Sequence, residues 1–349
     1  HALVDASEKL IKACQEMVGL MEDVKGAAAI QRDIASMALY LKDVINSIEL
    51  IVFEGSDTFA YSVQLARKKN TYSRRSEKLD ALMLNVGNEL AERLYARTHS
   101  IVFTSATMTI ANAFDSFFTA LGLSEEGERA TVHLQLGSSY DFDENMKIYV
   151  VEDMPEPNDA RYLAALEQLL IDIHRASAGS TLSLFTNRRE MERAHSTVQA
   201  ALKGDGLRVV CQKWGVSVKG LRDEFIADEH LSLFALKSFW EGFDAPGATL
   251  KTVVIPKLPF SKPTDPLSCA RAQMDAQAWS HYVLPQAVIE TKQAAGRLIR
   301  SAHDTGSLIL ADRRLVTKGY GKVFLKSMPS RNITISSARE VVAALSQDR

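Results

Sequence analysis

Cysteine is scarce in this chain, which has only Cys14, Cys211 and Cys269 among its 349 residues. These three lie far apart and are odd in number, so the sequence excludes a CxxC-type zinc site and a disulfide framework. Three cysteines also cannot by themselves complete a four-cysteine iron–sulfur cluster. Sparse cysteine is typical of a reducing compartment, and we expect a cytoplasmic protein.

Long apolar runs and an excess of one charge are lacking as well. No run reaches the length of a membrane span and the N-terminus shows no signal-peptide pattern, so we expect no membrane partner. The formal net charge is −2, so any contact with nucleic acid needs local basic patches. With 46% hydrophobic and 24% charged residues, the composition excludes a disordered chain. The length suffices for two globular domains, or three if one is small.

The first fifty residues are predicted to be helical. Apolar residues recur every three or four positions over residues 10–21, with Ser7 as the expected N-cap, and again over residues 30–48. Residues 59–65 alternate, which indicates a short strand, and another helix is expected over residues 85–97.

After residue 100, short apolar runs alternate with helical stretches. Strands that are buried on both faces and separated by helices predict a parallel, doubly wound α/β sheet. The expected strands are residues 101–103, 147–151, 181–185, 207–210, 231–235, 252–255 and 307–310. Helices are expected over residues 162–176 and 188–202, and a domain boundary near residues 137–146.

Polar clusters follow three of these strands, where ligands of open parallel sheets gather. Residue 103 is followed by Thr104-Ser-Ala-Thr-Met108, and residue 185 by Thr186-Asn-Arg188. Residues 238–247 contain two glycines and a proline, which predict a loop, and this loop displays Glu241 and Asp244. Each cluster could also serve only to cap the following helix.

Two arginines near the C-terminus share a short segment with an amide. The segment reads Gln293-Ala-Ala-Gly-Arg-Leu-Ile-Arg300. On a helix, Arg297 and Arg300 would lie on one face, while Leu298 and Ile299 would turn towards a core. Paired guanidinium groups suit a polyphosphate because each binds oxyanions in two places. The competing interpretation is a solvated helix face.

Together these segments resemble the DinG/XPD-type branch of superfamily 2 DNA helicases. Thr104–Met108 is similar to helicase motif III, residues 239–244 to motif V, and Gln293–Arg300 to motif VI. Residues 310–315 (Leu-Ala-Asp-Arg-Arg-Leu) and 319–321 (Gly-Tyr-Gly) extend the resemblance, which covers roughly residues 80–330. His1 resembles the last residue of a DEAH box (motif II), and a remnant of a purification tag is the competing interpretation.

The resemblance implies a C-terminal piece of a longer enzyme with a RecA-like fold. Residues 1–75 would be a helical, arch-like insertion, residues 76–140 the C-terminal part of the first RecA-like domain, and residues 141–349 the second RecA-like domain. The chain departs from the family in lacking a Gly-x-x-x-x-Gly-Lys-[Ser/Thr] phosphate loop and the Asp-Glu pair for Mg²⁺. An iron–sulfur cluster, where relatives have one, would precede residue 1. We therefore expect negligible ATPase activity from this chain alone.

The family mechanism implies a site for ATP and Mg²⁺ between two lobes. Arg297 and Arg300 would contact the β- and γ-phosphates as arginine fingers, and Gln293 would sense the nucleotide or its attacking water. Further residues would bind the nucleotide or couple the ribose and arginine positions to the grip on DNA: Glu241, Gly242 and Asp244. Ser105 and Thr107 would link hydrolysis to strand movement.

Single-stranded or forked DNA is the expected partner, besides the rest of the polypeptide, and a monomer is expected. The candidate DNA contacts are Ser105, Thr107, Thr186, Asn187, Arg67, Lys68, Lys69 and Tyr72, with Arg74, Arg75, Phe239 and Trp240 as further candidates. A solvated loop is the competing interpretation for the basic stretch, and a core position for Trp240.

Two other classes remain open. The chain could be a non-catalytic RecA-like module that binds nucleic acid or a protein partner. It could also belong to another nucleotide-dependent α/β enzyme, such as a translocase or a nuclease subunit, although no metal-binding cluster at the strand ends supports a nuclease. The resemblance implies 5′ to 3′ unwinding in DNA repair or replication.

Overall fold

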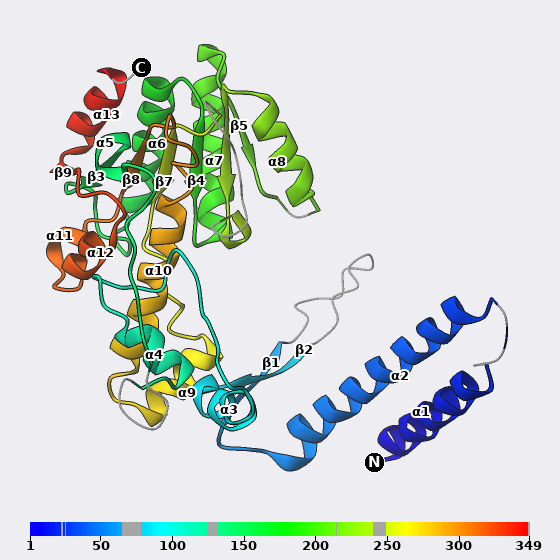
Figure 1. Cartoon of the computed structure of the whole chain (residues 1–349). Coiled ribbons are helices and arrows are strands. Elements are labelled where there is room, and N and C mark those ends of the chain that lie inside the picture. The colour runs from blue at the N-terminus through cyan, green and yellow to red at the C-terminus, as the bar shows by residue number, and fades with distance from the viewer. Residues whose placement is uncertain are drawn as a thin grey trace. The chain divides into compact units, whose positions relative to one another are not determined.

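A computed structural model describes residues 1–21, 24, 26–64, 78–124, 131–213, 215–239 and 249–347. The chain divides into two compact units (Figure 1). The first comprises His1–Val86 and Pro263–Met274, and the second comprises Gly87–Lys262 and Asp275–Arg349. No helix within the described ranges is long and apolar enough to cross a membrane.

The first unit contains a helix pair and a small antiparallel ladder. Helices α1 (Ala2–Leu20) and α2 (Ala28–Ile48) pack against each other, and a π-helix (Glu49–Glu54) follows α2. Strands β1 (Phe59–Gln64) and β2 (Lys78–Met83) pair in antiparallel register. Helix α9 (Pro266–Met274) joins this unit, and its Arg271 Nε donates to the Leu84 carbonyl at 3.0 Å. Both expected helices and the strand over residues 59–65 are confirmed.

The second unit is built on a seven-stranded sheet with the order β5-β6-β4-β7-β8-β3-β9. Every neighbouring pair in this sheet is parallel, which confirms the predicted doubly wound α/β class. The strands are β3 (Met146–Val151), β4 (Thr181–Leu184), β5 (Arg208–Cys211), β6 (Leu231–Ala235), β7 (Thr252–Ile255), β8 (Gly306–Leu310) and β9 (Ile333–Ser336).

Helices connect these strands and cover both faces of the sheet (Figure 1). The helices that follow β3 are α6 (Tyr162–Ser177), α7 (Arg188–Leu202), α8 (Val218–Ala227), α10 (Leu284–Ala295), α11 (Arg314–Thr317), α12 (Gly321–Ser327) and α13 (Ala338–Gln347). Three further helices precede β3 in the chain: α3 (Val86–Arg93), α4 (Asp115–Leu121) and α5 (Phe142–Asn145). Side chains of α6, α7 and α13 pack on one face, and those of α8, α10 and α12 on the other.

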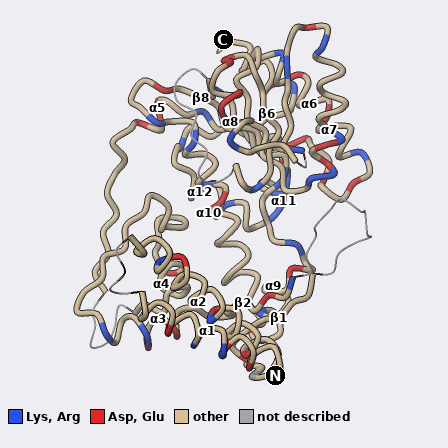
Figure 2. Tube along the Cα trace, turned by 90° about the vertical axis from the view of Figure 1, so that its right-hand side faces the viewer, with Lys and Arg blue, Asp and Glu red and all other residues tan. Residues whose placement is uncertain are grey.

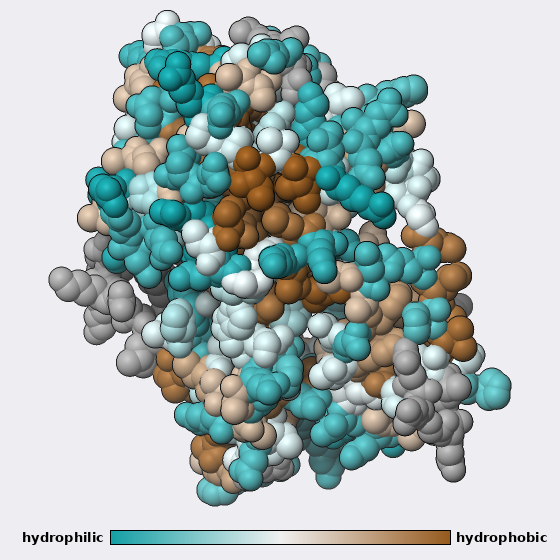
Figure 3. Space-filling model, turned by 90° about the vertical axis from the view of Figure 1, so that its left-hand side faces the viewer, coloured by the Kyte–Doolittle hydropathy of each residue, from teal (hydrophilic) through white to brown (hydrophobic). Residues whose placement is uncertain are grey.

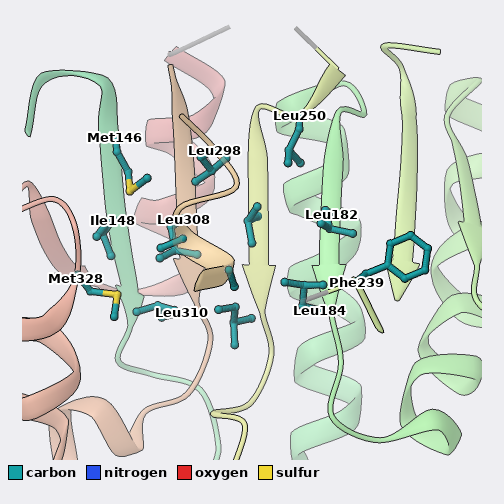
Figure 4. Packing of buried hydrophobic residues seen from close by; sticks show 14 of the residues in the cluster. Met146, Ile148, Leu182, Leu184, Phe239, Leu250, Leu298, Leu308, Leu310 and Met328 are labelled. Atoms are coloured by element: carbon teal, nitrogen blue, oxygen red, sulfur yellow. The ribbon is translucent and has the colours of Figure 1, made fainter. Parts of the chain in front are cut away.

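Two hydrophobic cores result, one on each face, because successive strand residues point to opposite sides. Figure 4 shows the core on one face of the sheet, where Ile148 projects from β3, Leu308 from β8 and Leu182 from β4. All three side chains are fully buried. The strands read as continuous apolar runs because both of their faces are covered by helices.

One expected strand was wrong. Residues 101–103 form no ladder within the described part of the chain, and Val102 is 87% exposed. The run has the composition of a buried strand, but a strand also needs a neighbour with free backbone groups. Conversely, β2 and β9 were missed because half-exposed strands give weak sequence patterns.

His174 on α6 is a buried titratable group of the second unit. Its Nδ1–H donates to the Leu170 carbonyl at 2.5 Å, and its ring lies 5.6 Å from the ring of Phe234. Burial lowers the pKa of His174 to about 4, and the bond to Leu170 offsets this only in part. The native state therefore holds a neutral imidazole at neutral pH.

We predict that acid destabilises the second unit through this histidine. The unfolded chain binds a proton near pH 6.5 and the native state only near pH 4, so stability is lost as the pH falls through this window. Between pH 7.5 and pH 5 the loss from His174 is about 2 kcal/mol. Urea unfolding of His174→Asn at both pH values should show a pH dependence smaller by this amount. An exposed control, His303→Asn, should keep the wild-type pH dependence, and equal slopes for both variants would contradict the assignment.

Candidate functional site

Helix α10 ends before the arginine pair. Its hydrogen-bond pattern stops at Ala295, and tighter turns follow, in which Arg297 N–H donates to Ala294 O and Leu298 N–H to Ala295 O, both at 3.2 Å. The expectation that Arg297 and Arg300 share a helix face was therefore wrong. Gly296, a weak helix former, sits at the end of the helix, and the chain then turns so that the next residues reach the core.

Leu298 and Ile299 anchor this arginine turn (residues 296–301). Each is only 2% exposed, as the sequence predicted for these two apolar residues. Figure 4 shows Leu298 beside Met146 and Leu308, above the start of β8. A Cβ atom on Gly306 would lie 2.8 Å from Leu298 Cδ2 and 2.8 Å from the Lys251 carbonyl oxygen, so only glycine lets Leu298 pack this closely. The core thus fixes the backbone that carries both arginines.

Asp304 holds the other end of the turn. Its carboxylate accepts hydrogen bonds from Arg300 N–H at 2.7 Å, from Ser301 N–H at 2.8 Å and from the Ser301 hydroxyl at 2.9 Å. Burial alone would raise the pKa of Asp304, but these bonds and the Arg300 charge lower it overall. The ionised carboxylate therefore fixes the backbone at Arg300.

The Gln293 side chain lies one helical turn before Arg297. Its Oε1 is buried and accepts no hydrogen bond within the described residues. A buried amide oxygen without a donor costs free energy, so this atom fits a donor from a bound ligand or an ordered water. In the sensing role predicted from the sequence, Gln293 Oε1 would lie next to a bound nucleotide.

Lys292 connects α10 to the hydroxyl-rich segment Thr104–Met108. Its Nζ donates to the carbonyl and the hydroxyl oxygen of Thr109, both at 3.2 Å, and burial lowers its pKa. Within the segment, Ser105 and Thr107 lie together, with Thr107 N–H donating to Ser105 Oγ at 3.2 Å. Of these two predicted DNA-contacting residues, Ser105 is exposed and Thr107 is half-buried. Thr109, two residues further on, is bound to Lys292 of helix α10, which also carries Gln293.

Thr186 and Asn187 follow β4 at its carboxyl end. Asn187 is the N-cap of α7, because its Oδ1 accepts the Arg189 N–H at 3.0 Å, and its Nδ2 donates to Glu190 at 3.4 Å. The capping interpretation therefore holds for Asn187. The side chain of Thr186 is exposed at the same sheet edge.

A charged network at this edge was not assigned from the sequence. Asp312 follows β8 and is 1% exposed; its carboxylate accepts from Leu258 N–H and pairs with Arg314 at 2.5 Å. Lys257 follows β7 and pairs with Glu190 at 2.7 Å. The Asp-Arg-Arg sequence at residues 312–314 was visible, but its burial and pairing depend on which strands become neighbours.

Other predicted residues have different outcomes. Phe239 is 1% exposed and belongs to the core (Figure 4), which removes it as a stacking candidate for DNA. Two groups lie outside the described residues: Trp240, Glu241, Gly242 and Asp244, and Arg67, Lys68, Lys69, Tyr72, Arg74 and Arg75. Among the residues described, no group of three or more His, Cys, Asp or Glu side chains could hold a metal ion.

Comparisons with known proteins decide the relationship. Residues 170–331 match the family described as "Helicase C-terminal domain". The chain is 35% identical over 266 residues to the ATP-dependent DNA helicase YoaA of Escherichia coli (strain K12), covering 74% of this chain and 40% of that protein. This chain carries a helicase C-terminal domain of the DinG/XPD type.

Two further proteins, one curated and one of solved structure, are similar to this chain over most of its length. The chain is 27% identical over 317 residues to a Bacillus subtilis (strain 168) protein named 3'-5' exonuclease DinG, covering 88% of this chain and 33% of that protein. A solved XPD helicase structure superposes with a TM-score of 0.58 and 17% identity over 92% of this chain and 55% of that one, which supports the fold. The chain spans between a third and a half of the length of the curated relatives compared.

We predict that Asp304→Ala loosens the arginine turn. Losing the acceptor for two backbone N–H groups and one hydroxyl should lower the free energy of unfolding by about 1–3 kcal/mol at pH 7. The native pKa is depressed, so the difference should vanish as the pH falls through that pKa and wild-type Asp304 is protonated. Urea unfolding at pH 7 and pH 3 measures both effects. Asp223→Ala on the exposed side of α8 is the matched control, and an equally stable Asp304→Ala would refute the role.

Proposed function

We propose that this chain is the C-terminal part of an ATP-dependent DNA helicase. In this proposal ATP hydrolysis between two RecA-like lobes drives 5′ to 3′ movement along single-stranded or forked DNA, in repair or replication. The proposal rests on the arginine turn. Burial of Leu298 and Ile299 and the hydrogen bonds to the Asp304 carboxylate fix the backbone that carries the two guanidinium groups. The proposal is supported by several relatives that are named ATP-dependent DNA helicases.

The donor set of the site fits a polyphosphate. Arg297 and Arg300 are permanently charged and half-buried, so their attraction for phosphate oxygens is less screened than on an open surface. Gln293 adds a buried amide oxygen one helical turn away. We propose that the arginines stabilise charge on the transferred γ-phosphate and that Gln293 orients the nucleotide or water. Glu241, Gly242 and Asp244 would complete the site.

The phosphate loop and the Mg²⁺ ligands are proposed to come from another segment of a longer polypeptide. The 349 residues contain no Gly-x-x-x-x-Gly-Lys-[Ser/Thr] sequence. Bound Mg²⁺ would neutralise phosphate charge, while this chain would contribute the arginines. We therefore propose that this chain alone has negligible ATPase activity.

Exposed apolar side chains support the proposed division into an arch-like segment (1–75), the end of a first lobe (76–140) and a second lobe (141–349). Residues 131–136 form no helix or strand, and the ring of His133 lies 4.9 and 5.7 Å from those of Phe114 and Phe118. Val132, Leu134 and Leu136 alternate with it and are 91%, 74% and 76% exposed. Hydrophobic residues are visible at the surface on the face seen in Figure 3. An apolar row of this kind fits a strand whose sheet is completed by another segment.

The second candidate is a non-catalytic RecA-like binding module. It would keep the same fold and use the exposed hydroxyl segment around Ser105 and Thr107 for nucleic acid. The buried Gln293 oxygen beside the arginine turn favours the nucleotide-dependent proposal, because contacts with backbone phosphates alone would not need a buried acceptor next to the arginines.

In a longer protein that includes the phosphate loop, Arg300→Ala should lower the ATPase turnover about 10³- to 10⁵-fold, with binding of single-stranded DNA retained. Steady-state phosphate release and fluorescence anisotropy with a labelled oligonucleotide measure the two properties. Arg339→Ala, at an exposed position of α13, should leave both unchanged. ATPase activity near wild type in Arg300→Ala would reject the arginine-finger role.

The proposed lobe division predicts that the double variant Val132→Lys, Leu134→Lys loses little stability in the 349-residue chain but much more in a longer protein. In the 349-residue chain these exposed positions should tolerate lysine within about 0.5 kcal/mol. In a longer protein that contains the rest of the first lobe, the same pair should cost more than about 2 kcal/mol, because both positions would be buried and lysine would replace apolar contacts with a desolvated charge. Urea unfolding of both proteins compares the costs, and equal costs would contradict the division.

A further inference from the structure

Helices α1 and α2 of the first unit have more apolar surface than their own pairing buries. The two helices run antiparallel side by side (Figure 1), and Gln31 Nε2 of α2 donates to the Val18 carbonyl of α1 at 3.3 Å. The side chains buried along this seam are those of Val4, Cys14, Ala38 and Ile45. Many large apolar side chains of the same two helices are exposed.

Six of these apolar residues form one continuous face. They recur every seven residues on each helix and are Leu3, Leu10 and Met17 on α1 and Ile30, Met37 and Val44 on α2. A spacing of seven keeps residues on one side of a helix. On both helices this stripe lies just before the buried seam in the sequence, so in an antiparallel pair the two stripes lie on the same side. The first five are 47–66% exposed and Val44 is half-buried.

The charges of the helix pair are nearly balanced. Helices α1 and α2 carry four basic and five acidic side chains. Figure 2 marks basic residues in blue and acidic residues in red. A nearly neutral surface does not attract a strongly charged partner such as a nucleic acid. A second copy of the same helix pair, in contrast, would meet no net repulsion.

The α1 side of the apolar face is complementary to itself. If a two-fold axis crossed α1 between residues 11 and 12, α1 would pack antiparallel on α1 of a second copy. Leu10 would then face Ala13 of the second copy, and Ala6 would face Met17. Large side chains opposite small ones let two helices interdigitate. Further out, Lys9 lies close to Glu16 of the second copy, and the symmetry creates this ion pair twice.

The same axis also serves α2. The contact between Gln31 and Val18 sets residues 37 and 38 of α2 level with residues 11 and 12 of α1. Met37 of each copy would therefore lie at the axis, in the middle of its stripe. At the rim, Asp33 would approach Asp43 of the second copy, and the neighbouring Arg32 supplies the opposite charge.

The apolar face has the area that a stable dimer needs. Helix α1 has 19 residues and α2 has 21, so the pair is about 30 Å long at 1.5 Å per residue. Two helices packed about 10 Å apart are about 20 Å wide, which gives a face of about 600 Å². Two such faces bury about 1,200 Å², where the range of specific interfaces begins, and interdigitated side chains add to this.

We infer that the apolar face of the helix pair binds the same face of a second copy of this chain. The two helix pairs form a four-helix bundle in which all neighbouring helices are antiparallel. This dimer replaces the monomer that was expected from the sequence. The inference uses only α1 and α2 and does not depend on the proposed function.

Sedimentation velocity of the nuclease-treated 349-residue chain tests the apolar face. We expect dimers at about 100 µM, since interfaces of this size reach micromolar affinity. Met37→Glu places two carboxylates at the axis and should raise the dissociation constant more than about 100-fold. Leu39→Glu is the matched control, because Leu39 lies on the same helix, is 65% exposed and is outside the apolar face. It should leave the dissociation constant unchanged.

A charge exchange within α1 tests the two-fold arrangement without an apolar substitution. Lys9→Glu or Glu16→Lys alone should weaken the dimer roughly threefold, because each brings like charges together twice. The double variant Lys9→Glu, Glu16→Lys should recover wild-type affinity. A wild-type chain that is monomeric at about 100 µM would overturn the inference. Equal effects of Met37→Glu and Leu39→Glu, or no recovery in the double variant, would overturn it as well.

Discussion

Burial of Leu298 and Ile299 is the interaction on which the candidate site depends. Two arginines on a surface turn would otherwise sample many positions, and each phosphate contact would cost side-chain and backbone entropy. Because the two apolar residues between them fit into the sheet core, the backbone at both arginines is fixed before any ligand arrives. Asp304 adds a second fixed point through ionic hydrogen bonds. Preorganisation of this kind is what electrostatic stabilisation of a transferred phosphate requires.

The same sheet also organises the contacts with DNA that we propose. Helix α10 carries Gln293 next to Lys292, and Lys292 binds Thr109 just after the hydroxyl residues Ser105 and Thr107. The partly buried ammonium group of Lys292 makes the connection stiff, since breaking it would leave a partly desolvated charge. In the function that we propose, a change in nucleotide occupancy at the end of α10 would have a short covalent and hydrogen-bonded route to the hydroxyl segment.

Much of the fold could be predicted from the sequence, and the exceptions share a physical cause. Strands β3 to β8 were predicted because they are apolar on both faces, and α7 was placed to the residue. Residues 101–103 have the same apolar composition as these strands, but they pair with no strand in the described part of the chain. Pairing depends on a neighbouring strand, which composition does not specify. Residue spacing and charge singled out the arginine pair, and the family resemblance implied its role. Its turn geometry, the Asp304 anchor and the buried Asp312–Arg314 pair follow from tertiary contacts that no local pattern encodes.

Gly306 shows how far such a site extends beyond its chemistry. It opens β8, contacts no predicted ligand and carries no functional group, but Leu298 and the Lys251 carbonyl occupy the space that a side chain would need. Alanine at this position would displace Leu298 and, with it, the arginines, while the sheet itself could still form. In a mutational screen, position 306 would thus be scored with the proposed site residues although it has only a steric role. The geometry of the arginine turn therefore depends on the absence of one methyl group at the first residue of β8.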